Sequence, residues 1–232
     1  MTTHLTRGLV ALAFMVLSVA GAGGADAANR TAAPKTVVLV GASIGEGWKI
    51  ERLAERTGLE GYALRHVALY EFDKTPAIEA LLRSAQKPDV VMIKECSTYF
   101  PGDLVEYRRK VAVWVRMLRE AGVQPVLVTT APLGAPEGAV ERGKSGLKRL
   151  LGRDSAADGI AAFNDWMKAY AERERIPLFD LEAVLRRGAG ERWMKPEYDS
   201  GDRVHLNAAG YRAMDRAFAQ FLSGTPALRT ER

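Results

Sequence analysis

The sequence predicts an α/β fold, a three-layer α/β/α sandwich around a central, mostly parallel five-stranded sheet. The main observation is that short, nearly continuous apolar runs alternate with segments whose apolar residues recur every three or four positions. The first pattern is typical of strands buried on both faces, and the second is typical of amphipathic helices. Strands and helices that alternate in this way form parallel sheets covered by helices on both sides.

Five apolar segments are expected to form the strands: residues 36–42, 62–69, 89–95, 125–130 and 177–181. The clearest helix lies between the third and fourth strands, where apolar residues are spaced by three or four and Gly122 ends the pattern. Its apolar positions are Leu104, Tyr107, Val111, Trp114, Val115 and Leu118. The last helix carries an apolar face of Tyr211, Met214, Ala217, Phe218 and Phe221.

The N-terminal residues have the pattern of a secretory signal peptide. Arg7 precedes an apolar stretch over 8–19, and the small-x-small sequence Ala-Asp-Ala at 25–27 supplies a cleavage site. The stretch is shorter than the ~20 apolar residues that span a membrane, so we expect no stable membrane insertion after the signal is removed. We therefore predict a signal peptide over 1–27, one domain over 28–232, and an exported protein, periplasmic or secreted.

Composition narrows the choice of partners and cofactors. The formal net charge is +5, and basic residues occur in small clusters such as 108–110 rather than in one long tract. Such clusters are typical of solvated helix faces, so we expect no nucleic-acid partner, while an acidic polymer stays open. The single cysteine, Cys96, excludes an intrachain disulfide. Only His66 and His205 follow the signal peptide, without clustered ligand spacing, so no metal and no cofactor are expected.

One stretch departs from the alternation of strands and helices. Residues 133–158 are rich in glycine and charged residues and follow the fourth strand. Ligands of open α/β sheets bind outside the carboxyl ends of the strands, so a long loop insertion there is a candidate lid or substrate wall. The alternative is a surface insertion without a function.

The first strand runs into a glycine-rich turn, GASIGEG at 41–47, which fits three templates. The spacing of Gly41, Gly45 and Gly47 resembles the cofactor turn of short-chain dehydrogenases. The pattern Gly-x-Ser-x-Gly around Ser43 resembles the nucleophile elbow of α/β-hydrolases. The third template is a serine that ends the first strand of its domain and acts as a nucleophile.

The first two templates conflict with the rest of the chain. A short-chain dehydrogenase needs a tyrosine and a lysine four residues apart late in the chain, whereas the only such pair, Tyr70 and Lys74, directly follows the second strand. The α/β-hydrolase fold has several strands before its serine, whereas Ser43 follows the first strand. The third template is therefore favoured.

A serine is a weak nucleophile unless a base takes its proton. His66 lies inside the second predicted strand, where a structural role is expected. His205 lies in the stretch DSGDRVHLNAAGYRAM, three positions after Asp202. An aspartate at this spacing can hold the imidazole in the correct tautomer and stabilise the imidazolium. The alternative is that Asp202 and His205 only begin a helix.

The D-x-x-H pattern of Asp202 and His205, followed by LNAAGY, resembles the last block of the SGNH (GDSL-type) hydrolases. Phe-Asn-Asp at 163–165 and the later IPLFDL are similar to the segment that precedes this block, and Ser43 matches the first block. This resemblance spans essentially the whole chain after the signal peptide and implies a flavodoxin-like fold. It implies Ser43 as the nucleophile, His205 as the general base and Asp202 as its orienting partner, with glycines that let the backbone bend sharply.

The sequence departs from the family pattern in two blocks. No glycine follows the second strand, and the third strand is followed by KECST at 94–98, so that Cys96 and Thr98 replace the family's glycine and asparagine. In the family, the glycine that follows the second strand and the asparagine that follows the third strand help to bind the oxyanion. The candidates for oxyanion or substrate binding are therefore Thr98, Ser97, Lys94 and Glu95. The two charged residues either serve the site or form an ion pair of their own, and the cysteine is expected to be a small buried residue.

These features together predict an exported serine esterase of the SGNH type, which cleaves an acyl ester carried by a small molecule, a glycan or a lipid. An O-acyltransferase would use the same three residues. A non-catalytic module would instead use the altered blocks as a sugar- or polymer-binding cleft. Specificity lies in the loops, so neither the substrate nor the oligomeric state is predicted.

Overall fold

Five strands form one fully parallel sheet in the computed structural model, which describes residues 33–136 and 155–230. The strands are β1 (Lys35–Gly41), β2 (Tyr62–Ala68), β3 (Val90–Lys94), β4 (Gln124–Val128) and β5 (Leu178–Phe179), in the spatial order β2-β1-β3-β4-β5. The predicted α/β sheet is confirmed, and each of its strand pairs is parallel. Predicted strand ends differ by at most two residues, and β5 keeps two residues because Asp180 already caps the next helix.

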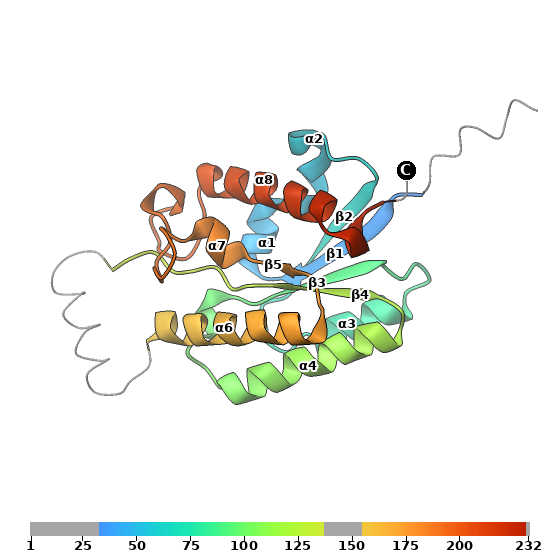
Figure 1. Cartoon of the computed structure of the whole chain (residues 1–232), viewed down its shortest axis with the longest axis horizontal. Coiled ribbons are helices and arrows are strands. Elements are labelled where there is room, and N and C mark those ends of the chain that lie inside the picture. The colour runs from blue at the N-terminus through green and yellow to red at the C-terminus, as the bar shows by residue number, and fades with distance from the viewer. Residues whose placement is uncertain (1–32, 137–154, 231–232) are drawn as a thin grey trace, which may run out of the picture. The chain divides into compact units, whose positions relative to one another are not determined.

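Helices cover the sheet on both faces (Figure 1). One layer contains α1 (Ser43–Trp48), α2 (Leu53–Thr57), α7 (Leu181–Leu185) and α8 (Ala208–Gly224). The other layer contains α3 (Thr75–Arg83), α4 (Leu104–Glu120) and α6 (Ala156–Glu174). Short 3₁₀ turns lie between them: η1 (Ile50–Arg52), η2 (Ser97–Tyr99), η3 (Pro196–Tyr198) and η4 (Pro226–Leu228).

The alternation of side chains along the central strands builds two separate cores. Leu39 of β1 packs in one cluster with Phe218 of α8, whereas its neighbour Val40 packs in the other cluster with Trp114 of α4. Both faces of β1 are therefore buried, which explains why this strand is apolar without interruption.

Local signals set the ends of the long helices. Asp103 accepts hydrogen bonds from the amides of Val105 and Glu106 and so caps α4, and Gly122 follows its end with a φ of 73°. The predicted helix between the third and fourth strands is thus confirmed at both ends. α8 begins after Asn207, whose side chain accepts hydrogen bonds from two amides of its first turn.

Two of the predicted segments lie outside the described residues, the signal peptide at 1–27 and most of the loop at 133–158. The loop prediction is wrong at its end, because residues from Ala156 onward belong to α6. Ser155 and Asp158 form a capping box that begins this helix inside the charged stretch. Within the described ranges, no helix is both long and apolar enough to cross a membrane.

Parallel strands bring the segments that follow them to one edge of the sheet. Gly41 at the end of β1 lies opposite Ala68 of β2, and Val40 lies opposite Ile93, so that Lys94 ends β3 beside Gly41. The segments after β1, β2 and β3 therefore meet at the carboxyl edge, where ligands bind in open α/β sheets.

Candidate active site

Ser43 is the first residue of α1, directly after the turn that leaves β1. The preceding Ala42 has extended backbone angles (φ −91°, ψ −152°), and its carbonyl accepts the amides of Gly45 and Glu46, so the helix begins abruptly. This arrangement holds the serine side chain at the carboxyl edge of the sheet.

The glycines of this turn have a different role from the one expected. None of Gly41, Gly45 and Gly47 is among the residues with positive φ, so the prediction that they permit a sharp bend is wrong. Each instead allows a close approach by another segment. An added Cβ would lie 3.2 Å from the carbonyl oxygen of Lys94 at Gly41 and 2.5 Å from Nε2 of His66 at Gly45, and at Gly47 it would overlap the phenol of Tyr211.

Ser43, His205 and Asp202 are hydrogen-bonded in series. Nε2 of His205 lies 2.8 Å from Oγ of Ser43, and Nδ1 lies 2.5 Å from Oδ2 of Asp202. A carboxylate accepts only, so Nδ1 carries the proton and Nε2 is left as an acceptor for the serine hydroxyl. Side chains from two distant parts of the chain are thus brought together in the order serine, histidine, aspartate.

The loop that contains Asp202 keeps its carboxylate ionised. Oδ1 accepts the amides of His205 at 2.8 Å and of Val204 at 2.9 Å, and the hydroxyl of Ser200 at 3.0 Å. The His205 amide and the His205 imidazole are the main reasons why the pKa of Asp202 lies well below its usual range. The carboxylate therefore remains charged beside the imidazole across the neutral range.

Asp202 and His205 do not begin a helix, since α8 starts only after the Asn207 cap. They belong to a loop in which Asp199 accepts the amides of Gly201 and Arg203 through Oδ1. Both of these residues have positive φ, 106° and 69°. Hydrogen bonds from its own amides to the Asp199 side chain thus fold the loop before it reaches the histidine.

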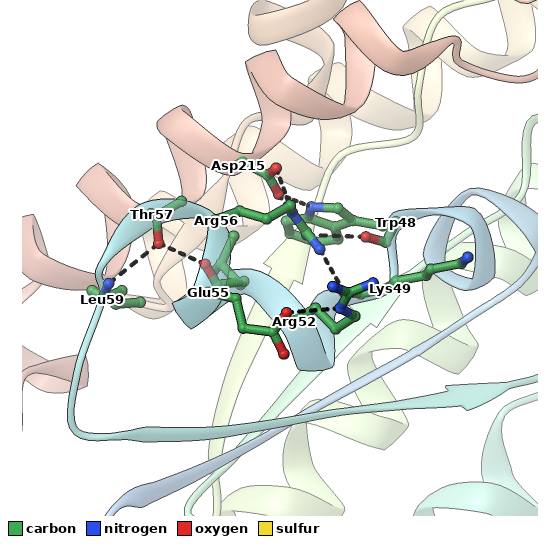
Figure 2. A network of polar contacts seen from close by, with 9 residues as sticks. Trp48, Lys49, Arg52, Glu55, Arg56, Thr57, Leu59 and Asp215 are labelled. Atoms are coloured by element: carbon green, nitrogen blue, oxygen red, sulfur yellow. Dashed lines mark hydrogen bonds and ion pairs between the residues drawn. The ribbon is translucent and has the colours of Figure 1, made fainter.

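A network around Asp215 joins α1, which begins at Ser43, to α8, which follows His205 (Figure 2). Asp215 on α8 accepts Nε1 of Trp48 at 2.8 Å and both Nε and Nη2 of Arg56 at 2.7 and 2.8 Å. Trp48 ends α1, and Arg56 lies on α2. Since the Asp215 side chain is nearly buried, at 7% exposure, this network holds α1 against α8 and so supports the alignment of serine and histidine.

His66 lies beneath α1. Its Nε2 is 2.9 Å from the carbonyl oxygen of Gly41, and its backbone amide donates to Glu51. Burial lowers the pKa of His66, which favours the neutral ring. This placement agrees with the structural role expected from its position in a strand.

The candidates after β3 differ in what their side chains contact. Ser97 is buried and donates its hydroxyl to the carbonyl oxygen of Ala131 at 2.7 Å, so that proton is already used. Thr98 is exposed, with Oγ1 3.1 Å from Sγ of the buried Cys96. Lys94 is buried and donates to the carbonyl oxygen of Glu95 at 3.0 Å, and burial lowers its pKa to about 8.

Glu95 does not pair with Lys94. Its carboxylate instead lies 2.7 Å from Nζ of Lys74, and both side chains are fully buried. Lys94 lies on the same face of β3 as Val90 and Met92, which pack in the α1 layer. Glu95 follows the strand and meets Lys74, whose ammonium lies over the ring of Trp114 in α4. The alternative in which these two neighbours form an ion pair of their own is therefore wrong.

The sequence did not predict that three further residues, Lys74, Asn164 and Tyr70, contribute to the structure around the site. Lys74 is the buried partner of Glu95, and nothing in its surrounding sequence marks it as buried. Asn164 of α6 holds the chain after β4 by bonding both the amide and the carbonyl of Thr130, and its position inside the FND stretch was the available signal. Tyr70 follows β2, is 59% exposed, and donates its hydroxyl to Glu46, one turn after Ser43.

A parallel α/β sheet that carries a serine, a histidine and an aspartate in hydrogen-bonded series at its carboxyl edge has the parts of a serine hydrolase. A comparison with protein families agrees. Residues 22–213 match the GDSL-like lipase/acylhydrolase family. The chain belongs to this family of ester-hydrolysing enzymes, and the predicted relation to SGNH hydrolases is confirmed.

Solved structures share the fold at low sequence identity. A Bacteroides fragilis protein described as an acylhydrolase is 21% identical with a TM-score of 0.62, covering 85% of this chain and 91% of its own. A GDSL-like lipase from Bacteroides thetaiotaomicron is 20% identical with a TM-score of 0.58, over 80% and 86%. An acetylxylan esterase from Geobacillus stearothermophilus is 17% identical with a TM-score of 0.54, over 86% and 98%. Catalytic mutants of that esterase change a serine in one structure and an aspartate in another. Among curated proteins, none is significantly similar in sequence.

Proposed function

We propose that this protein is an exported serine esterase in which Ser43 is the nucleophile, His205 the general base and Asp202 its orienting partner. The observation that carries the proposal is the pair of short contacts on either side of the imidazole, 2.8 Å to the serine and 2.5 Å to the aspartate. The catalytic mutants of the acetylxylan esterase support it, because they change the same two residue types.

The reaction follows from these contacts. Oγ of Ser43 attacks the acyl carbon of the ester while its proton passes to Nε2 of His205. The tetrahedral intermediate collapses, the C–O bond to the alcohol breaks, and His205 returns the proton to the departing alkoxide. Water then attacks the acyl-enzyme and gives a proton to His205, the bond to Oγ breaks, and His205 returns the proton to Ser43 as the carboxylic acid leaves. Throughout, Asp202 stabilises the imidazolium without taking its proton.

The oxyanion of the tetrahedral intermediate needs hydrogen-bond donors, and this chain lacks the glycine and the asparagine that bind it in the family pattern. The hydroxyl of Thr98 is the proposed side-chain donor, since it is exposed and weakly engaged by the sulfur of Cys96, whereas that of Ser97 is committed to Ala131. The backbone amide of Ser43 is the second proposed donor. Lys94 contributes positive potential from beneath Gly41.

The proposed substrate is an acyl ester on a glycan or a small molecule. The similarity in fold to an acetylxylan esterase favours a short acyl group on a polysaccharide. Export is proposed from the N-terminal pattern, and the mature protein should then begin at or near Ala28. Mass spectrometry of secreted or periplasmic protein checks this start, and an intact Met1 terminus would overturn it.

Hydrolysis of p-nitrophenyl acetate and of acetylated xylan tests the esterase proposal. Ser43→Ala and His205→Ala should each reduce turnover by several orders of magnitude, and the double variant should be hardly worse than either, because the residues act as one unit. Additive losses, or turnover that survives Ser43→Ala, would contradict the assignment. A folded wild type without turnover on any ester would favour the binding module.

A further inference from the structure

The two segments that depart from the family pattern are joined to each other by a buried ion pair. Lys74 ends the segment after β2, and Glu95 lies in the segment after β3. Nζ of Lys74 and Oε2 of Glu95 are 2.7 Å apart, and neither side chain is exposed to solvent. The pair therefore crosses between the two segments that reach the carboxyl edge beside Ser43.

Aromatic rings enclose the charge of Lys74. Its ammonium lies 5.6 Å from the ring centres of Phe72 and Tyr99 and 5.8 Å from that of Trp114. Phe72 also stacks on Tyr107 at 3.7 Å, and the Tyr107 hydroxyl donates to the backbone carbonyl of Tyr99 at 3.0 Å. Rings from three segments thus fix the pair in one geometry.

Stability alone does not account for this pair. Replacing a buried ion pair by apolar side chains of similar volume is often neutral or stabilising, because desolvation offsets the attraction. Here one carboxylate oxygen, Oε1 of Glu95, has no hydrogen-bond partner within the described part of the chain, which adds to the cost. Burial accordingly raises the pKa of Glu95, against the opposing effect of Lys74.

What the pair provides is a fixed position for the backbone between Lys94 and Thr98. Glu95 lies near the start of this segment, three residues before the threonine proposed to bind the oxyanion. We propose that Lys74 and Glu95 are positioning residues, which hold the segment 94–98 where its donors meet the transition state. This inference rests on the proposed esterase function.

The test removes both charges and keeps the volume, in the variant Lys74→Met/Glu95→Leu. The variant should stay folded with a melting temperature near that of the wild type, while kcat for p-nitrophenyl acetate falls at least ~10-fold and KM changes by less than about twofold. A matched control is Lys168→Met/Glu182→Leu, which removes the 2.6 Å ion pair between α6 and α7 and should leave kcat unchanged.

Wild-type kcat in the folded double variant would overturn the positioning role and leave the esterase proposal intact. A wild type without turnover would overturn both. If the double variant does not fold, Glu95→Gln decides, because the amide keeps the volume of the side chain but replaces the charge-assisted contact with Lys74 by a weaker one. A lower kcat at unchanged KM then supports the role, and an unchanged kcat refutes it.

Discussion

Gly45→Ala is expected to reduce catalysis through the packing of α1 on His66. The new Cβ would lie 2.5 Å from Nε2 of His66, whereas ordinary contact begins near 3.4 Å, so the two groups must separate by about 0.9 Å. His66 has little freedom to move, because its ring nitrogen meets the Gly41 carbonyl and its backbone amide is bound by Glu51. The start of α1, with Ser43 two residues earlier, must therefore take up most of the shift.

The magnitude follows from this displacement. A misplacement of about 1 Å in a catalytic group costs on the order of 10²-fold in rate, and overpacking costs about 1–3 kcal/mol of stability. We therefore expect kcat for p-nitrophenyl acetate to fall ~10- to 100-fold, with a modest fall in melting temperature. Adding His66→Ala removes the obstructing ring and should restore much of kcat.

Gly224→Ala is the matched control, since a Cβ at this last residue of α8 would meet no atom within 4 Å. It should behave as the wild type. If Gly45→Ala also keeps full turnover and stability, then α1 does not pack on His66 as described, and the close-approach explanation of the turn glycines is refuted.

Two further predictions concern the segment after β3. Thr98→Val should lower kcat at least ~10-fold with little change in KM or melting temperature, because the lost hydrogen bond strengthens only in the transition state. An equal kcat in wild type and variant would exclude the Thr98 hydroxyl as an oxyanion donor. Burial lowers the pKa of Lys94 to about 8, so its ammonium is lost as the pH rises through that value, and kcat should fall there in the wild type and not in Lys94→Met. Between that pH and the ordinary pKa of lysine, the unfolded chain binds more protons than the folded chain does. The free energy of unfolding of the wild type should therefore rise with pH relative to that of Lys94→Met. Parallel stability profiles of the two proteins would show that Lys94 is not buried as a cation.

The fold and the pairing of Asp202 with His205 were predictable because their signals are local. Apolar runs buried on both faces predict parallel strands whatever their partners, and the three-residue spacing of Asp202 and His205 is visible within one loop. The meeting of Ser43 with His205 was predicted by the resemblance to SGNH hydrolases and by the need of a serine for a base.

The remaining features depend on contacts between distant segments, which spacing does not reveal. Glu95 pairs with Lys74, 21 positions away, rather than with its neighbour Lys94. The turn glycines are required by Lys94, His66 and Tyr211, which come from three other elements, and not by their own backbone angles.

Labelling by a fluorophosphonate, with the modified residue located by peptide mass spectrometry, tests the central claim most directly. The claim is that Ser43 is a nucleophile activated by His205. The account predicts one adduct, on the peptide that contains Ser43, which is absent in Ser43→Ala and forms far more slowly in His205→Ala. A folded wild type that forms no adduct, or an adduct that persists in Ser43→Ala, would contradict it.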